Sequence, residues 1–268
     1  MTKLMPVIKW TGSKRSQAEE IISYFPKINT YYEPFLGGGS VMGAATFKNA
    51  VCGDICKPLI ELWKDIKNHP KAVSNSYRDD WNKLQNQGYT YYYDVRDEFN
   101  QKRSPRKFLF LTRTCCNGLI RFNQKGEFNN SFHLTRKGIN PDTLEKIISR
   151  WSEKIQNVEF KVGDYRDTTK DAKAGDLVYL DPPYFHNKDR YENNLVFDEF
   201  IDYLRDLNKR KVKFVLSFDG FRGDKKYETE IPKDIFKRHI LLKAGNSSVN
   251  NVLNQKKEMV YESLYLNW

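Results

Sequence analysis

Short apolar runs that stop at an acidic residue or at a glycine recur along the chain. Such runs are typical of strands that are buried on both faces of a parallel sheet. Strands are predicted near residues 30–33, 50–55, 158–162, 177–180, 213–217 and 259–268. Apolar residues at helical spacing lie within 15–25, 58–67 and 197–207. Strands that alternate with helices in this way predict an α/β fold with a mostly parallel sheet.

This alternation of strands and helices is interrupted between residues 67 and 154. Helical patterns dominate the segment, and Asn140-Pro141 is a typical helix start. Before that helix, Asn123–Gly126 has the composition of a hairpin turn, with polar side chains on the strands that would flank it. The sequence therefore predicts a discontinuous sheet domain of residues 1–66 and 155–268. Residues 67–154 are predicted to form a mostly helical insert that carries a β-hairpin.

Positive charge is concentrated in this insert. The chain of 268 residues carries a formal net charge of +11 and has a pI near 9.3. Residues 67–154 hold 17 lysines and arginines against 9 aspartates and glutamates, which gives +8 of that total. Evenly spread charge would serve solubility alone, whereas a local excess favours a polyanionic partner. The interpretation we favour is a folded protein that binds nucleic acid.

Cysteine, histidine and hydropathy patterns remove several other classes. The four cysteines lack C-x-x-C spacing and the four histidines are scattered, so neither a metal site nor a disulfide framework is predicted. No apolar run approaches the length of a membrane span, and the first residues do not resemble a secretory signal. These patterns predict a reduced, cytoplasmic protein that does not interact with membranes.

The most distinctive chemistry lies at Asp181-Pro182-Pro183-Tyr184, directly after the apolar run at 177–180. The prolines end the strand, so Asp181 is expected at the carboxyl end of a parallel strand, where open α/β sheets bind ligands. The Asp181 carboxylate and the Pro182 carbonyl offer two acceptors side by side, and Tyr184 offers a ring face. Together they suit a planar amino group on an aromatic base. The alternative is an ordinary strand end followed by a proline turn.

Two earlier strand ends suit a nucleoside. Glu33 is followed by Pro34-Phe35-Leu36 and by three glycines at 37–39, which let a ligand approach the backbone closely. Asp54 ends the next predicted strand, where nucleotide-binding sheets hold ribose hydroxyls. The glycines do not match G-x-G-x-x-G, so a nucleoside without pyrophosphate fits better than a dinucleotide. The turn at Gly12–Lys14 suits an anion but is not a Walker loop.

Three motifs in a fixed order carry a resemblance to a known family. They are Lys9-Trp10-x-Gly-x-Lys14, Glu33-Pro34-Phe35-x-Gly-Gly-Gly and Asp181-Pro182-Pro183-Tyr184, with Asn117-Gly118-Leu119-Ile120-Arg121-Phe122-Asn123 in the insert. In these motifs the chain resembles the Dam-like (D12 class, α group) DNA adenine-N6 methyltransferases. The resemblance implies a Rossmann-like, S-adenosylmethionine-dependent methyltransferase sheet. Residues 1–66 and 155–268 would form the catalytic domain, and residues 67–154 the target-recognition insert.

The resemblance also implies a pocket for S-adenosylmethionine. Asp54 would hold the ribose and Ile55 would lie against the adenine. Asp164 and Tyr165 would contact the adenine on its other side, and Asp181 would lie near the methionine end. The full set implied for this pocket is Trp10, Lys14, Phe35, Gly37, Gly39, Asp54, Ile55, Asp164, Tyr165 and Asp181.

The implied reaction is methyl transfer to N6 of adenine in a specific sequence of double-stranded DNA. The adenine amine is a weak nucleophile, so the rate would come from alignment and from acceptors that stabilise positive charge on nitrogen. Asp181, Pro182 and Tyr184 are the catalytic residues that this chemistry needs. The adenine must leave the duplex to reach a pocket at the strand ends, where Tyr184 would stack on it.

DNA contacts are expected from the N-terminal motif and from the predicted hairpin. By motif match Arg121 would read a guanine, and Lys9 would contact a second base. The residues expected to contact DNA are Lys9, Asn117, Leu119, Arg121, Asn123, Lys125 and Ser131, with Arg103 and Lys107 at phosphates. The chain departs at two places from the family members that recognise GATC. Cys116 lies where they often have an intercalating aromatic residue, and Asn129-Asn130-Ser131-Phe132 replaces their common Asn-Val-Pro-Phe. A GATC target is therefore not implied.

Other functions share parts of this pattern. One alternative is methylation of another planar amine, namely cytosine N4, RNA or a protein glutamine amide. At the position of Asp181, enzymes that methylate cytosine N4 tend toward Ser, and those that methylate protein glutamine tend toward Asn. Cytosine C5 chemistry would need a Pro-Cys nucleophile, which the chain lacks. A catalytically silent DNA-binding protein of the same fold is a further alternative. A separately encoded restriction endonuclease would be a partner if the protein serves restriction and modification.

Overall fold

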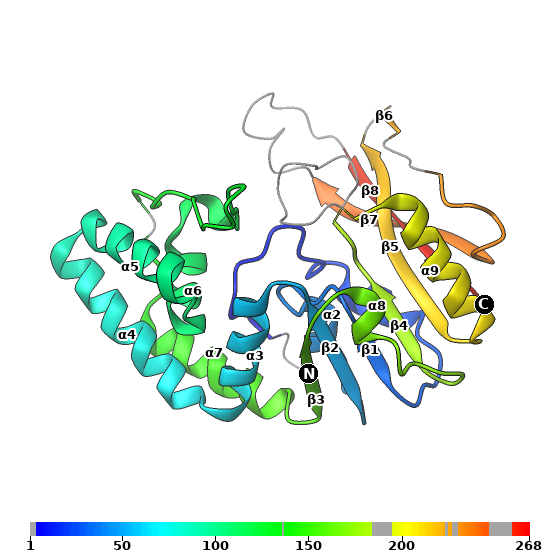
Figure 1. The fold of residues 1–268 in the computed structure, drawn as a ribbon, viewed down its shortest axis with the longest axis horizontal. Coiled ribbons are helices and arrows are strands. Elements are labelled where there is room, and N and C mark those ends of the chain that lie inside the picture. The colour runs from blue at the N-terminus through cyan, green and yellow to red at the C-terminus, as the bar shows by residue number, and fades with distance from the viewer. Residues whose placement is uncertain (1–3, 136, 184–194, 223–224, 227–229, 247–258) are drawn as a thin grey trace.

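One mixed sheet forms the centre of the part of the molecule outside residues 67–154 (Figure 1). The computed structural model describes residues 4–135, 137–183, 195–222, 225–226, 230–246 and 259–268. The strands are β1 (Tyr31–Glu33), β2 (Ala50–Asp54), β3 (Val158–Val162), β4 (Leu177–Leu180), β5 (Lys213–Arg222), β6 (Lys225–Lys226), β7 (Arg238–Asn246) and β8 (Met259–Leu266). Their order across the sheet is β3-β2-β1-β4-β5-β8-β7, and β6 pairs with β5.

The strand directions identify a doubly wound sheet. The strands from β3 to β5 run parallel, whereas β8 runs antiparallel between β5 and β7. The chain winds outward in both directions from the boundary between β1 and β4, which is the switch point where such sheets bind ligands. The predicted Rossmann-like sheet is confirmed. The sequence prediction omits β7, although the apolar run at 240–242 marks it.

Helices cover both faces of the sheet, and β4 shows why. Its residues are buried on alternate sides: Leu177 and Tyr179 belong to one hydrophobic cluster, and Val178 and Leu180 to the other. The first cluster includes side chains of α1 (Ala18–Ser23), α2 (Ser40–Ala44) and α3 (Lys57–Asn68). The second includes side chains of α8 (Tyr165–Thr168) and α9 (Phe197–Lys209). A strand with no solvent-facing side reads as a continuous apolar run.

In its described residues the insert contains four α-helices, and it lies beside the sheet at the left of Figure 1. They are α4 (Pro70–Gln87), α5 (Tyr89–Lys102), α6 (Pro105–Thr114) and α7 (Pro141–Lys154), with a 3₁₀ turn η1 (Cys116–Gly118) after α6. The predicted start of α7 is confirmed, because Asn140 Oδ1 accepts hydrogen bonds from the backbone N–H groups of Asp142 and Thr143. The chain enters the insert after β2 and leaves it into β3.

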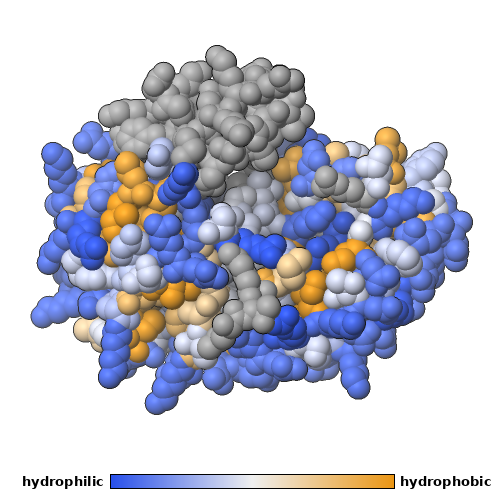
Figure 2. All heavy atoms as spheres, turned by 180° about the vertical axis from the view of Figure 1, so that it is seen from behind, coloured by the Kyte–Doolittle hydropathy of each residue, from blue (hydrophilic) through white to orange (hydrophobic). Residues whose placement is uncertain are grey.

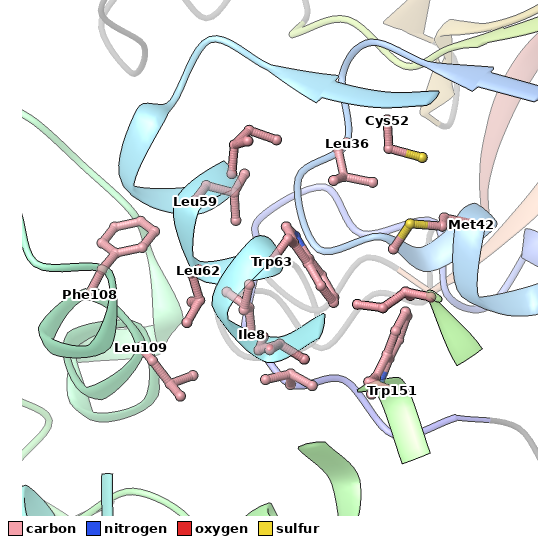
Figure 3. Close-up of a cluster of buried hydrophobic side chains, with 14 of the residues drawn as sticks. Ile8, Leu36, Met42, Cys52, Leu59, Leu62, Trp63, Phe108, Leu109 and Trp151 are labelled. Atoms are coloured by element: carbon pink, nitrogen blue, oxygen red, sulfur yellow. The ribbon is translucent and has the colours of Figure 1, made fainter. Parts of the chain in front are cut away.

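The insert and the sheet share one hydrophobic core (Figure 3). Trp63 on α3 packs against Trp151 on α7, with ring centroids 5.0 Å apart. Ile8 from the N-terminal segment and Phe108 from α6 belong to the same cluster. Because this cluster runs through both parts, the core is not divided at the predicted boundaries, 66/67 and 154/155. These domain boundaries stay a prediction.

Two basic residues of the insert that were predicted to contact phosphates, Lys107 and Arg103, have partners within the protein. Lys107 Nζ lies 2.7 Å from Asp80 Oδ1, and the Asp80 side chain is only 2% exposed. Tyr91 Oη donates to the same oxygen over 2.6 Å, which ties α4, α5 and α6 together. The Arg103 guanidinium donates to the Gly126 carbonyl and lies over the Phe99 ring. Internal acceptors engage both cations, which argues against the phosphate contacts predicted for Lys107 and Arg103; those contacts stay a prediction.

The predicted β-hairpin is only partly correct. Its turn forms: the Gly126 N–H donates to the Asn123 carbonyl, and Asn123 Oδ1 accepts from the N–H groups of Lys125 and Glu127. The flanking segments pair only through the isolated bridges Phe122↔Phe128 and Cys115↔Phe132. Asn117, with φ of 55°, and Gly118, with φ of 65°, turn the chain between these bridges and prevent a continuous ladder. We call residues 115–132 the recognition loop.

The surface of the described residues is largely polar. The face seen in Figure 2 is mostly hydrophilic, with apolar side chains in small separate groups. Within the part of the chain that the structure describes, no helix has the length and hydropathy that a membrane span requires. Among the same residues, no group of three or more His, Cys, Asp and Glu side chains is arranged to hold a metal ion.

Candidate active site

A cavity of about 550 Å³ lies at the carboxyl ends of β1, β2, β3 and β4. The segments that follow these strands line it, together with residues 10–14 of the N-terminal loop and the start of α9. Ile120 and Phe122 of the recognition loop line it from the insert. The cavity therefore occupies the switch point of the sheet and extends to the segment predicted to contact DNA.

The glycine-rich loop after β1 is held to the end of β2 by Asp54. The N–H of Gly37 donates to Asp54 Oδ2 over 3.0 Å, and the N–H of Cys56 donates to Oδ1 over 2.9 Å. Burial raises the pKa of Asp54 to about 6, although these N–H groups lower it. Gly37 has φ of 48°, and a Cβ there would lie 2.6 Å from Trp10 Nε1. Only glycine allows this close approach to the Trp10 ring.

One predicted pocket residue lies elsewhere. Gly39 is the N-cap of α2 with φ of 65°, and it is absent from the cavity wall. A Cβ at Gly39 would lie 2.8 Å from Met42 Cε and 3.1 Å from Trp63 Cζ2. Gly39 therefore has a structural role, since it lets α2 begin against the core, and the prediction that it contacts the cofactor stays a prediction.

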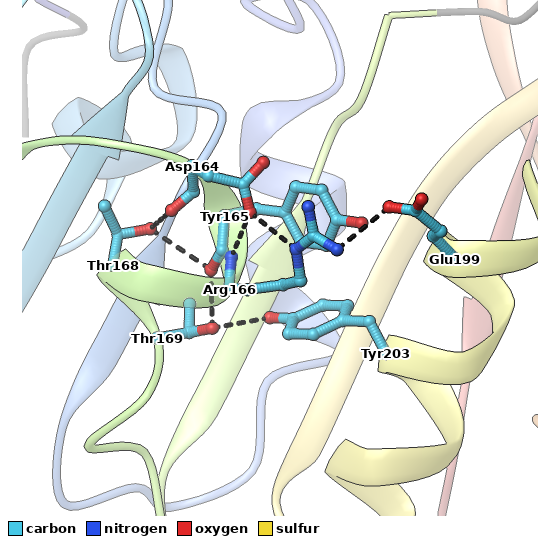
Figure 4. Close-up of polar contacts among 7 residues, drawn as sticks. All are labelled: Asp164, Tyr165, Arg166, Thr168, Thr169, Glu199 and Tyr203. Atoms are coloured by element: carbon cyan, nitrogen blue, oxygen red, sulfur yellow. Dashed lines mark hydrogen bonds and ion pairs between the residues drawn. The ribbon is translucent and has the colours of Figure 1, made fainter. Parts of the chain in front are cut away.

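Aromatic and acidic side chains meet at the β3 end of the cavity. Phe35 stacks on Tyr165 with centroids 5.5 Å apart, and the half-exposed Ile55 lines the same cavity. Asp164 caps α8, because its Oδ1 accepts from the backbone N–H and the Nε–H of Arg166 (Figure 4). Arg166 in turn contacts Glu199 on α9 over 2.9 Å. An apolar slot with an acid beside it suits a purine that carries an amino group.

The opposite end of the cavity holds Asp181, directly after β4. Its Oδ1 lies 2.9 Å from Lys14 Nζ, and the Lys14 side chain is 4% exposed. Burial raises the pKa of Asp181 to about 6, and the Lys14 ammonium opposes this rise. Pro182 is buried beside Asp181, whereas Tyr184 lies outside the described residues. Lys14 therefore lines the cavity as predicted, and the structure adds that it is an ion-pair partner of Asp181.

Two carboxylates near Asp181 escaped the sequence analysis as functional residues. Glu33 is 3% exposed, and its Oε2 accepts from Tyr31 Oη over 2.9 Å and from the Met42 N–H over 3.0 Å. Glu262 on β8 lies 3.6 Å from Lys14 Nζ. Glu33 was visible as the acid that ends β1. Glu262 is the one charged residue in the sequence of β8, Met259–Leu266, and no local pattern indicates that it meets Lys14.

Glu33→Gln is expected to flatten the pH dependence of stability. Burial raises the pKa of Glu33 to about 8, well above its ordinary value of 4.5. Between these values the folded protein holds a proton that the unfolded chain has released, so the free energy of unfolding falls as pH rises. Urea denaturation between about pH 6 and pH 8 isolates Glu33, because Asp54 and Asp181 have pKa values of about 6. Equal slopes for the two proteins would contradict this assignment.

The N-terminal motif and the recognition loop meet beside the cavity. A Cβ at Gly118 would lie 2.9 Å from Lys9 Cβ, so the Lys9 side chain packs against the η1 turn. Asn117 is exposed, and Leu119 is 41% exposed although it is apolar. The buried Asn130 fixes this turn, because its Nδ2 donates to the carbonyls of Cys116 and Leu119. The structure thus brings Lys9, Asn117 and Leu119 to one surface.

The remaining loop residues differ in their surroundings. Arg121 is exposed, and its Nε donates to Asn129 Oδ1 over 2.8 Å. Lys125 and Ser131 are also exposed. Asn123, by contrast, uses its side-chain oxygen within the turn and donates from Nδ2 to Glu127 Oε2 over 2.9 Å. These internal bonds favour a role for Asn123 in the shape of the loop over direct contact with DNA.

Comparisons with known sequences identify one family. Residues 10–249 match the family described as D12 class N6 adenine-specific DNA methyltransferase. The Type II methyltransferase M.MjaIII of Methanocaldococcus jannaschii is 31% identical over 99% of this chain and 100% of that protein. The DNA adenine methylase of Serratia marcescens is 34% identical over 69% of this chain and 68% of that protein. A solved structure, the rRNA methyltransferase aviRa from Streptomyces viridochromogenes, has 13% identity, covers 99% of this chain and 86% of that chain, and gives a TM-score of 0.38.

Proposed function

Because the chain belongs to the D12 class of N6 adenine-specific DNA methyltransferases, we propose that its cavity binds S-adenosylmethionine beside an adenine flipped from the duplex. The protein transfers a methyl group to N6 of adenine in DNA. The observation that carries the site assignment is the partly buried Asp181 carboxylate, which lines a cavity at the switch point of the sheet.

The residues of the cavity fit S-adenosylmethionine. Its volume of about 550 Å³ suits a nucleoside with a side chain. Asp54 would accept from the ribose hydroxyls, while Ile55, Phe35 and Tyr165 would hold the adenine and Asp164 would accept from its amino group. Trp10 and Gly37 would lie beside the sulfonium end, where the aromatic face of Trp10 suits a cation. When bound, S-adenosylmethionine supplies an electrophilic methyl group.

Asp181 and Pro182 would hold the amino group that receives this methyl. Two acceptors at the strand end fix the two N6 hydrogens, so that the nitrogen lone pair points toward the cofactor side of the cavity. Positive charge develops on N6 as the new bond forms, and the buried carboxylate stabilises it. Tyr184 would stack on the flipped base, a proposal that rests on the motif alone. Ile120 and Phe122 would exclude water from the insert side.

The surface around the recognition loop would read DNA. Lys9, Asn117 and Leu119 lie together on it, and Arg121 is exposed close by in the sequence. Lys125 and Ser131 would contact the phosphate backbone, a role that the positive charge of the insert supports. We propose a target other than GATC because of Cys116 and residues 129–132. A cytoplasmic location and a separately encoded restriction endonuclease are further parts of this proposal, the latter supported by the Type II relative.

Arg121→Ala should weaken binding to the cognate site by about 1–3 kcal/mol and relax preference at one guanine. A guanidinium can donate to guanine O6 and N7 together, which lysine cannot reproduce. Lys125→Ala is the matched control: it should weaken binding to all sequences alike and lower the salt dependence by about one counterion. Titration of cognate and single-substituted duplexes at several salt concentrations measures both effects. Equal loss on every duplex would make Arg121 a phosphate anchor.

Transfer of tritiated methyl groups to duplex DNA tests the proposed function. After hydrolysis of the DNA, the label is expected in N6-methyladenine. Label in N4-methylcytosine or in RNA would favour the other amine substrates, and no incorporation would favour a catalytically silent DNA-binding protein. Sequencing with methylation detection, on DNA from cells that express the protein, then identifies the recognition sequence.

A further inference from the structure

A buried ammonium ion lies between two carboxylates at the transfer end of the cavity. Lys14 Nζ is 2.9 Å from Asp181 Oδ1 and 3.6 Å from Glu262 Oε2. The three side chains are 4%, 20% and 19% exposed, respectively. They come from the loop before α1, from the end of β4 and from β8. Three segments far apart in the sequence therefore place two negative charges and one positive charge together.

Glu262 has a fixed position in the sheet. β8 lies between β5 and β7, and Glu262 pairs in register with Gly220 and Leu242. Its neighbour two residues on, Leu264, belongs to the hydrophobic cluster on the side of α1 and α3, and so does Tyr179 on β4. Side chains two apart on a strand share a face. Glu262 therefore faces the same side of the sheet as Tyr179 and reaches Lys14 from a strand that is paired on both edges.

Lys14 alone would oppose the proposed chemistry. An ammonium ion at 2.9 Å engages one oxygen of Asp181 and cancels most of its charge. Methyl transfer to N6 needs the reverse, since the nitrogen becomes positive and its hydrogens need acceptors. A pair of one lysine and one aspartate has no net charge, whereas the cluster with Glu262 carries a net charge of −1 when all three groups are ionised. Glu262 restores the negative charge that Lys14 removes.

We propose that Glu262 is a positioning residue for methyl transfer, which holds the Lys14 ammonium and so leaves the Asp181 carboxylate able to accept from the adenine amino group. This inference rests on the proposed function, because it takes Asp181 as the acceptor for N6. In the transfer, the bond from N6 to the methyl carbon forms while the bond from that carbon to sulfur breaks. The electron pair of the broken bond goes to sulfur, and N6 releases one proton to water. Glu262 forms and breaks no bond.

Several ionisable groups face Asp181. Burial raises the pKa of Asp181 to about 6, Lys14 lowers it, and the like charge of Glu262 raises it. Glu33, whose pKa burial raises to about 8, and Tyr179, whose pKa burial raises well above its ordinary value, also interact with Asp181. Removal of the charge on Glu262 should therefore lower the pKa of Asp181 and move the acid limb of the rate profile to lower pH.

Glu262→Gln tests the inference in the full-length protein with S-adenosylmethionine and duplex DNA. The single-turnover rate of methyl transfer near pH 7.5 is expected to fall about tenfold to hundredfold, less than for loss of a direct acceptor. The dissociation constants for DNA and S-adenosylmethionine should change less than about threefold, because Glu262 is absent from the cavity wall and from the recognition loop. Glu159→Gln is the control, since Glu159 also lies on a strand, 3.5 Å from Lys161, but outside the cavity wall.

A double-mutant cycle separates action through Lys14 from a merely structural role. In a Lys14→Met background, Glu262→Gln should no longer reduce the rate, because the ammonium ion that it positions is gone. An equal loss in both backgrounds would overturn the inference, and so would an unchanged rate and acid limb in Glu262→Gln alone. If Glu262→Gln fails to fold, Glu262→Asp keeps the charge but withdraws it from Lys14, and an intermediate rate is expected; a wild-type rate would overturn the inference.

Two different results would refute the catalytic role of Asp181 and the positioning role of Glu262. Wild-type turnover in Asp181→Ala would refute the catalytic role of Asp181 in the proposed function. An inactive Asp181→Ala together with wild-type behaviour of Glu262→Gln would refute only the role of Glu262.

Discussion

Asp181→Ala should reduce methyl transfer by about 10²–10³ or more, because a preorganised acceptor disappears where positive charge develops. The structure adds a second reason for a large loss. Lys14 Nζ lies 2.9 Å from Asp181 Oδ1, so the substitution leaves a nearly buried ammonium ion facing the position of N6. That ion would repel the charge that the reaction creates. Both effects act on the transition state, so the turnover number should fall more than the affinity for DNA.

Asp181→Asn is the matched variant for this experiment. It keeps the shape and one carbonyl acceptor but removes the charge, so an intermediate rate is expected. Single-turnover incorporation of tritiated methyl groups measures the chemical step, and titration of duplex DNA without cofactor measures binding. Binding should survive in both variants, since the residues proposed to contact DNA lie in the N-terminal motif and the recognition loop. Turnover of Asp181→Ala near that of the wild type would remove Asp181 from the mechanism.

Much of the fold could be predicted because β4 and its neighbours are buried on both faces. A strand such as Leu177–Leu180 has no solvent side, so it appears in the sequence as a continuous apolar run. Asp54 and Asp181 were both predicted at the carboxyl ends of strands, and both line the same cavity. Parallel strands force this result, because all their carboxyl ends lie at one edge of the sheet.

The parts that sequence analysis missed depend on pairing between distant segments. The contact of Lys14 with Glu262 joins the N-terminal loop to the last strand, and no local pattern encodes which lysine meets which glutamate. The same holds for Lys107, whose charge suggested a phosphate contact until its partner Asp80 was known. In the recognition loop, the sequence predicts the turn at Asn123. The backbone turn at Asn117 could not be predicted, because a hydrogen bond from Asn130, 13 residues later, to the Cys116 carbonyl holds it.

Asp54→Ala should weaken the binding of S-adenosylmethionine by roughly 1.5–3 kcal/mol, the scale of a hydrogen bond to a charged group. Asp54 has two tasks in the proposed pocket. It would accept from the ribose hydroxyls, and it already accepts from the N–H groups of Gly37 and Cys56 over 3.0 and 2.9 Å. Alanine removes the acceptor for the ligand and also releases the glycine-rich loop that lies against Trp10. Calorimetric titration of the purified variants with S-adenosylmethionine measures the loss.

Asp54→Asn keeps the size of the side chain and changes only its hydrogen bonds and charge. The amide has the same shape, but its NH₂ group must face either the Gly37 or the Cys56 N–H, so one of the two backbone bonds is replaced by repulsion. Affinity should therefore fall in Asp54→Asn as well, and Glu61→Ala, on the exposed side of α3, should leave it unchanged. Because the pKa of Asp54 is raised to about 6, the affinity of the wild type should also decline below that pH, while that of Asp54→Asn should not. Unchanged affinity in Asp54→Ala would mean that Asp54 organises the loop without contacting the ligand.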